Sequence, residues 1–145
     1  MDIRKITSVE THILRQQVLR PLQQPPDQVY PNDDAPDTLH AGAFHAGQLV
    51  GIATVFREPP PGENNPRAWR LRGMAVAPAM QRQGIGHALI EFCVAHIHAH
   101  GGTALWCYGR SSARAFYAAL GFRTIGAEFN IPASGAHFVF RREWM

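Results

Sequence analysis

Seven short segments of the chain have the apolar pattern of β-strands, and three others repeat apolar residues at helical spacing. The segment 103–107 is continuously apolar, as in a strand buried on both faces. This order of strand, helix, three strands, helix, strand, helix and two strands predicts an α/β fold with a mixed sheet flanked by helices. The predicted strands are 3–6, 38–45, 48–57, 69–76, 103–107, 122–129 and 137–142, and the predicted helices are 8–19, 84–100 and a short segment from Ser111 or Ser112 to Gly121.

Turn-forming residues set the predicted boundaries of these elements. Ser8 can cap the first helix, although Thr11 stands where a complete capping box has Glu or Gln. Pro21 ends that helix, and residues 21–37 form a proline-containing loop of unusual length. Gly101-Gly102 ends the second helix by permitting a left-handed cap.

The strand 69–76 leads into a glycine loop and then into the longest predicted helix. Within the strand, the small residues Gly73 and Ala75 share one face and leave room there for a flat group. The loop, residues 81–86, holds two glycines just before the helix begins, where free main-chain amides and the helix dipole favour an anion. Arg82 adds a positive charge, so the segment is either a pyrophosphate cradle or an ordinary strand-to-helix turn. A third glycine and Gly-Lys-Ser/Thr are missing, which excludes the dinucleotide fingerprint and the Walker loop.

Length and composition indicate one globular domain, residues 1–145, with 46% hydrophobic and 17% charged residues. The net charge is +3, and the 14 basic residues include only one lysine and no basic run. We therefore expect no nucleic-acid partner. With no signal peptide and no stretch near 18 apolar residues, we expect a cytoplasmic protein without membrane association. Whether the chain is a monomer or a homodimer stays open.

The cysteines and histidines do not predict a metal site. Cys93 and Cys107 fall in a helix and a buried strand, where free thiols are the usual state. His96, His98 and His100 alternate along a helix and cannot converge on one ion.

Two motifs resemble those of the GNAT superfamily of N-acetyltransferases. Gln81, Gly84 and Gly86, after Val76-Ala77-Pro78, match its acetyl-CoA loop position by position. The run Ala113–Phe122 matches its second signature, A-x-x-F-Y-x-x-x-G-F, in the order and at the separation usual for the family. The N-terminal half matches more loosely. Glu128-Phe129 and Gly135-Ala136-His137 resemble one uncharacterised bacterial branch of the superfamily.

This resemblance implies a GNAT-like, mainly antiparallel sheet in a single domain and transfer of an acetyl group from acetyl-CoA to a primary amine of a small molecule or peptide. Direct attack in a ternary complex is the expected mechanism, with Tyr117 donating a proton to the departing thiolate. The loop 21–37 is then either a surface insertion or a wall of the acceptor pocket. A catalytically silent acyl-CoA-binding module is the alternative. The expected cofactor-binding residues are Met74, Ala75, Val76, Gln81, Arg82, Gln83, Gly84, Ile85, Gly86, His87, Arg110, Arg114 and Tyr117.

Two departures from the family pattern concern catalysis. Arg110 stands where many relatives have an asparagine that bonds the pantetheine, and strand 69–76 lacks the glutamate that many relatives use as a base. His40 and His137 are the candidate catalytic bases, with Glu128 behind them; a water relay or an amine bound neutral is the other option. Arg70 or Arg72 near the acceptor would suit an amine that carries a carboxylate.

Overall fold

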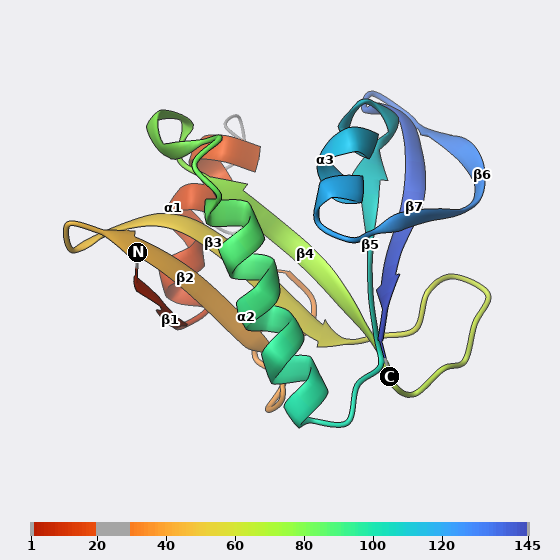
Figure 1. Ribbon diagram of the computed structural model, residues 1–145, viewed down its shortest axis with the longest axis horizontal. Helices are drawn as coiled ribbons and strands as arrows, with labels where there is room; N and C mark the ends of the chain where they lie inside the picture. Colours follow the sequence, from red (N-terminus) through yellow and green to blue (C-terminus); the bar gives the residue numbers. More distant parts are fainter. Residues whose placement is uncertain (1, 20–29, 145) are drawn as a thin grey trace.

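The structure, a computed structural model, describes residues 2–19 and 30–144, which form one seven-stranded sheet in the order β1-β2-β3-β4-β5-β7-β6 (Figure 1). β4 and β5 run parallel, and the other neighbouring pairs are antiparallel. The predicted α/β class and the predicted order of elements are therefore confirmed. The strands are β1 Asp2–Lys5, β2 Leu39–His45, β3 Gln48–Arg57, β4 Ala68–Val76, β5 Ala104–Arg110, β6 Arg123–Ile131 and β7 Gly135–Glu143.

The helical segments cover both faces of the sheet. The long helix α2, Ile85–Ala99, lies against β2, β3 and β4, and α3, Arg114–Ala119, follows β5 after the short turn η5, Ser111–Ala113. α2 buries Ile85, Leu89, Ile90, Cys93 and Ile97, which is the apolar stripe that packs on the sheet. The N-terminal helical segment lies across the opposite face of the sheet (Figure 1). Both cysteines are buried free thiols, as predicted.

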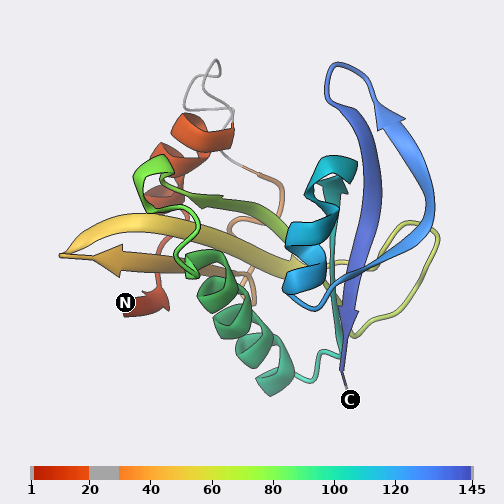
Figure 2. The same cartoon turned by 45° about the horizontal axis from the view of Figure 1, so that its top comes forward.

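The sheet divides where β4 and β5 meet. The two strands pair at three positions, from Ala68 with Ala104 to Arg70 with Trp106. Beyond that point β4 continues beside β3 as far as Val76, whereas β5 continues beside β7 as far as Arg110. Figures 1 and 2 show the two parts of the sheet diverging from this junction like the arms of a V. A space between strands is thus built into the middle of the sheet.

The first helical segment differs from its prediction in capping and in shape. The capping box is complete but begins one residue earlier: the main-chain N–H of Thr7 donates to Glu10 at 2.8 Å, and the N–H of Glu10 donates to Oγ1 of Thr7 at 3.3 Å. Ser8 makes no capping bond, so its predicted role is wrong. The segment passes from a 3-10 turn (η1, Val9–Thr11) through α1, His12–Leu14, to a wide π-type turn (η2, Arg15–Leu19). π-type turns are rare overall, and those that occur are often found at functional sites.

Several other element boundaries and caps agree only in part with their predictions. β5 extends to Arg110 because β7 pairs with it along its whole length, so that Arg110 lies opposite His137. Neither Ser111 nor Ser112 caps the helix that follows, contrary to prediction. Gly101 does adopt the predicted left-handed conformation (φ +79°), and the next N–H, that of Gly102, returns to the carbonyl of Ile97 at 2.8 Å.

The flat group expected against Gly73 is the ring of Tyr30. A Cβ at Gly73 would lie 3.0 Å from Cε2 of Tyr30 and 3.2 Å from Nε of Arg15, and Gly73 itself has φ +68° at a bulge in β4. Tyr30 therefore packs against the sheet, while residues 21–29 of the predicted loop lie outside the described residues. In the described ranges, no helix is long and apolar enough to cross a membrane.

Candidate functional site

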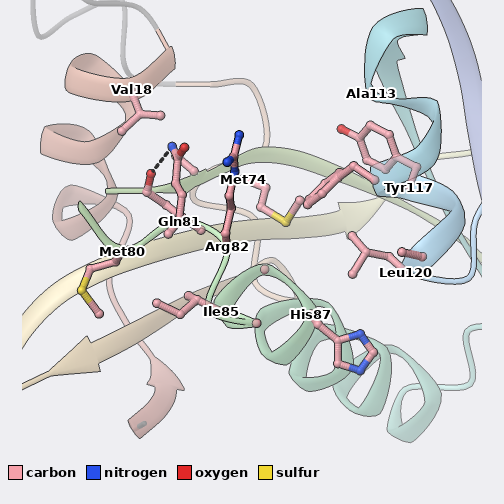
Figure 3. Close-up of a pocket in the computed structure, with 16 residues that line it drawn as sticks. Val18, Met74, Met80, Gln81, Arg82, Ile85, His87, Ala113, Tyr117 and Leu120 are labelled. Atoms are coloured by element: carbon pink, nitrogen blue, oxygen red, sulfur yellow. Dashed lines mark hydrogen bonds between the residues drawn. The ribbon is translucent and has the colours of Figure 1, made fainter. Parts of the chain in front are cut away.

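A cavity of about 590 Å³ opens between the glycine loop, the end of β4 and α3 (Figure 3). We call it the loop cavity. It brings together the two motifs of the sequence, which lie some thirty residues apart in the chain. Its described lining residues are Val18, Met74, Ala75, Val76, Met80, Gln81, Arg82, Gly84, Ile85, Gly86, His87, Ala113, Phe116, Tyr117, Ala119 and Leu120.

The glycine loop has the backbone conformation of an anion cradle. Arg82 and Gly84 both have positive φ, at +66° and +80°, and Gly84 is the N-cap residue of α2. The first amides of this 15-residue helix therefore face the loop cavity without intrahelical acceptors. A Cβ at Gly84 would meet nothing within 4 Å, and one at Gly86 would lie 3.6 Å from the ring of Phe116. The loop thus leaves open space in front of its amides, which fits the pyrophosphate of a coenzyme.

Gln81 closes this loop against the end of β4. Its side-chain amide Nε2 donates to the main-chain carbonyl of Val76 at 3.0 Å, the bond drawn in Figure 3. The side chain of Arg82 projects beside it from the loop. Gln81 therefore holds the loop against the end of β4, and Arg82 is the charged side chain among the loop residues that line the cavity.

The end of β4 turns main-chain groups toward the space between the strands. The N–H of Ala77 donates to the carbonyl of Val50 on β3 at 2.8 Å. Because such groups alternate along a regular antiparallel strand, those of Val76 point away from β3, and its carbonyl already accepts from Gln81. The N–H of Val76 is thus placed to bond an extended ligand in the space that opens beside the strand.

A second cavity, of about 550 Å³, lies on the other side of the same space. We call it the acceptor cavity. Met74 and Tyr117 line both cavities, so the two meet at these residues. Its described lining residues are Leu19, Arg70, Leu71, Arg72, Gly73, Met74, Cys107, Tyr108, Tyr117, Ile131, Pro132, Ala133, Ser134 and His137.

Tyr117 is held firmly at the junction of the cavities. Its ring stacks on that of Phe140 with centroids 4.4 Å apart and meets Phe116 and Phe122 edge-on at 5.2 and 5.8 Å. Burial raises the pKa of its phenol well above the usual value, and the neighbouring Cys107 raises it further. The phenol therefore stays protonated at neutral pH and can act as a donor. Burial likewise raises the pKa of the Cys107 thiol, to about 12, which keeps that thiol neutral.

The two candidate histidines lie in different places. His137 lines the acceptor cavity. His40 is 5% exposed and lines neither cavity; its Nδ1 lies 2.8 Å from Oγ1 of Thr54 and its Nε2 lies 2.8 Å from the carbonyl oxygen of Asp33. Both ring nitrogens of His40 thus contact groups of a buried network, and what separates it from His137 is its distance from the two cavities. Glu128, on β6, also lies outside the described lining of both cavities.

The two arginines of β4 point into the acceptor cavity with partners of their own. Nη1 of Arg70 bonds Glu58 at 2.9 Å, and its guanidinium lies 5.2 Å from the ring centroid of Tyr108. The guanidinium of Arg72 lies 4.2 Å from the centroid of Tyr30. The guanidinium groups of Arg70 and Arg72 thus place positive charge along one wall of the acceptor cavity.

Three predicted cofactor-binding residues, Gln83, Arg110 and Arg114, do not line the loop cavity. The guanidinium of Arg114 instead lies 5.2 Å from the ring of Phe138. Other lining residues were not predicted from the sequence. Phe116 could have been found from the second motif, whereas Val18 and Leu19 come from η2 and carry no local signal. Among the described residues, no group of three or more histidine, cysteine or acidic side chains gathers as a metal site would require.

A split mixed sheet with an anion cradle on one side of the split and a second cavity on the other is the architecture of an acetyltransferase fold. Residues 12–135 match the acetyltransferase (GNAT) domain family. The uncharacterised N-acetyltransferase YitI of Bacillus subtilis is 32% identical over 139 residues, which cover 96% of this chain and 93% of that protein. The chain belongs to the GNAT acetyltransferase family.

Solved structures show the same fold at low sequence identity. Escherichia coli ElaA has a TM-score of 0.77 and 15% identity, with 98% of this chain and 99% of that chain covered. An aminoglycoside 6'-N-acetyltransferase complexed with coenzyme A has a TM-score of 0.70 and 15% identity, with 99% and 97% covered. At sequence identities this low, the likeness shows a shared fold and does not indicate the substrate.

Proposed function

We propose that this protein transfers an acetyl group from acetyl-CoA to a primary amine of a small molecule or peptide, by direct attack within a ternary complex. The observation that carries the proposal is the meeting of two cavities at Met74 and Tyr117. One cavity has an anion cradle and the other has room for a second reactant. Amine and thioester can thus reach each other from opposite sides of the split sheet.

Three groups of this chain would hold the co-substrate. The amides at the start of α2 and the charge of Arg82 take the pyrophosphate. The main chain at the end of β4, above all the N–H of Val76, aligns the pantetheine in the space beside β4. The ring of Phe116, which lines the loop cavity opposite Gly86, packs on the co-substrate.

Tyr117 is the proposed donor to the departing thiolate. When the amine forms the new N–C bond, the C–S bond breaks and its electron pair stays on sulfur. A thiol has a pKa near 8.5, below that of the buried phenol, so complete proton transfer from Tyr117 is uphill. The phenol therefore acts mainly as a hydrogen-bond donor that stabilises the thiolate as it forms.

The test combines binding with turnover. Calorimetry should detect acetyl-CoA binding, and thiol release should then be followed over a panel of amino acids, polyamines, aminoglycosides and peptides. Amine-dependent release of CoA, with the acetylated amine identified by mass spectrometry, is the expected result. Tight binding of acetyl-CoA without turnover over the whole panel would favour the catalytically silent module.

A further inference from the structure

The turn between β6 and β7 borders the acceptor cavity and orients one histidine. Ala133 and Gly135 both have positive φ, at +66° and +100°, and the N–H of Ser134 donates to the carbonyl of Ile131 at 2.9 Å. This conformation returns the carbonyl oxygen of Gly135 to within 2.7 Å of Nδ1 of His137. A Cβ at Gly135 would meet nothing within 4 Å, so the glycine serves the backbone conformation rather than a lack of space.

The contact with Gly135 fixes the tautomer of His137. A carbonyl oxygen only accepts hydrogen bonds, so Nδ1 must carry the hydrogen. In the neutral ring the lone pair is then on Nε2. That nitrogen lies 3.4 Å from Oγ of Ser134, and both residues line the acceptor cavity. The basic atom of the ring is therefore on the side where the second reactant would bind.

Other titratable groups along this cavity are poorly suited to accept a proton. The pKa of Cys107 is raised to about 12, that of Tyr117 is raised by burial, and Arg70 and Arg72 are donors. On its own sheet His137 is flanked by Arg110 of β5 and Phe129 of β6, with Glu128 beside the latter. Of the described lining residues, His137 has the chemistry and the placement of a base.

We propose that His137 is the general base of the transfer, with Gly135 as the positioning residue that fixes its tautomer. This rests on the proposed function. As the amine nitrogen bonds the acetyl carbon, Nε2 of His137 takes the proton that the nitrogen loses. The C–S electron pair leaves with sulfur, which Tyr117 stabilises. Since Nδ1 carries the ring hydrogen, the hydroxyl of Ser134 donates to Nε2 at 3.4 Å in the free protein, and the amine displaces this long contact when it binds.

The tautomer is tested without any acceptor. Nitrogen-15 NMR of the imidazoles, with His137 assigned from the His137→Asn spectrum, should show a protonated Nδ1 and an unprotonated Nε2 in the neutral ring. Gly135→Ala strains the turn and should change this ratio. A ring protonated at Nε2 in the parent protein would overturn the proposal.

The base is tested by kinetics with acetyl-CoA and benzylamine as the probe amine. His137→Asn keeps a donor near Nδ1 but has no base, and we expect kcat/KM to fall by about 10²–10⁴-fold with loss of the acid limb of the pH–rate profile. Acetyl-CoA affinity should not change, and added imidazole should partly restore the rate of His137→Ala. His98→Asn, at an exposed position on α2, is the matched control.

The outcomes separate the two hypotheses. If His137→Asn keeps the acid limb and a rate within about threefold of the parent, the base is wrong and the proposed function stands. If the parent protein itself transfers no acetyl group to benzylamine or to any amine of the wider panel, the proposed function fails. The NMR result then still decides the tautomer.

Discussion

The guanidinium of Arg15, which is fully buried, makes two parallel hydrogen bonds to the carboxylate of Asp33, at 2.7 and 3.0 Å. Nη2 of Arg15 also bonds Thr54 on β3 at 3.0 Å, and its face lies 3.9 Å from the ring centroid of Tyr30. The pair fastens residues 30–37 to η2. Because η2 supplies Val18 to the loop cavity and Leu19 to the acceptor cavity, the pair supports a wall of both.

Asp33→Asn should make the protein less stable in a pH-dependent way. Burial alone would raise the pKa of Asp33, but hydrogen bonds from Arg15 and from the N–H of Tyr30 outweigh it and hold the pKa below its usual value. A carboxyl with a depressed folded pKa contributes stability above its unfolded pKa, near 3.8, and loses it as the pH falls toward the folded pKa. Removing one partner of a buried pair costs about 3–5 kcal/mol.

Thermal unfolding from pH 7 to pH 2 measures this effect. The gap in Tm between parent and Asp33→Asn should be widest near neutrality and should narrow below about pH 4. Asp37→Asn is the control, since it breaks the exposed pair with Arg57 and should cost about 1 kcal/mol or less. A gap that stays constant with pH would mean that packing, not charge, stabilises this region.

Gly84→Glu should abolish acetyl-CoA binding and leave a folded protein. The new carboxylate would enter the open space before the amides of α2, where it would repel phosphate. The matched control is Gly62→Glu, because Gly62 has nearly the same φ (+79°) and equally open surroundings but lies in the loop before β4. Both variants carry the same left-handed backbone cost of about 1–2 kcal/mol. Near-normal affinity of Gly84→Glu by calorimetry would refute the cradle.

Arg82 should contribute charge rather than shape. Arg82→Gly removes the charge and relieves the positive φ, so the melting temperature should not fall. We expect acetyl-CoA affinity to fall about 3- to 10-fold at low ionic strength and less at high ionic strength, as screening predicts. Arg82→Lys should retain most of the affinity. A loss of acetyl-CoA affinity that does not change with ionic strength would indicate a structural role instead.

Tyr117→Phe should slow turnover while preserving the fold and the binding of acetyl-CoA. The ring, which stacks on Phe140, is kept, and only the phenol oxygen is lost. Because burial raises the pKa of this phenol, the loss in kcat should lie at or below the lower end of the ~10²–10⁴-fold range of general acids. An unchanged kcat, or a drop that follows a lower Tm, would make Tyr117 a core residue only.

Gly109→Ala tests the position of the Tyr117 ring, whereas Tyr117→Phe tests the phenol oxygen. A Cβ at Gly109 would lie 2.6 Å from Cε2 of Tyr117 and 2.8 Å from Cε2 of Phe140, so both rings must move. We expect a loss of about 1–3 kcal/mol in stability and a loss of turnover together. Tyr117→Phe should lower turnover alone. Wild-type stability of Gly109→Ala would show that the rings have room to shift.

Sequence patterns predicted the features of the structure that depend on residues close together in the chain. The period of apolar residues gave every strand and helix in order, and the glycine spacing located the loop at the start of α2. Contacts between distant segments were not predictable in this way. The ring that fills the face of Gly73 comes from Tyr30, more than forty residues earlier, and nothing near either residue indicates the pairing.

The sequence also could not distinguish the surroundings of the two candidate histidines or choose the cap of the first helix. His40 and His137 are both buried strand histidines, and only tertiary structure places one in the Arg15 network and the other in the lining of the acceptor cavity. For the first helix, the local pattern allowed two registers. The Thr7–Glu10 box outweighed Ser8 because it satisfies two main-chain donors reciprocally.

The division of the sheet follows the order of the chain. Strands β1 to β4 and α2 come from the first part of the chain, and β5 to β7 with α3 come entirely from the last forty or so residues. A nascent chain that ends before Ala104 already contains the glycine loop but lacks Tyr117 and His137. The site thus forms only when the second part of the sheet docks at the three residue pairs between β4 and β5. A chain that ends before Ala104 therefore lacks the residues proposed to meet the amine and the thiolate, and we expect it to transfer no acetyl group.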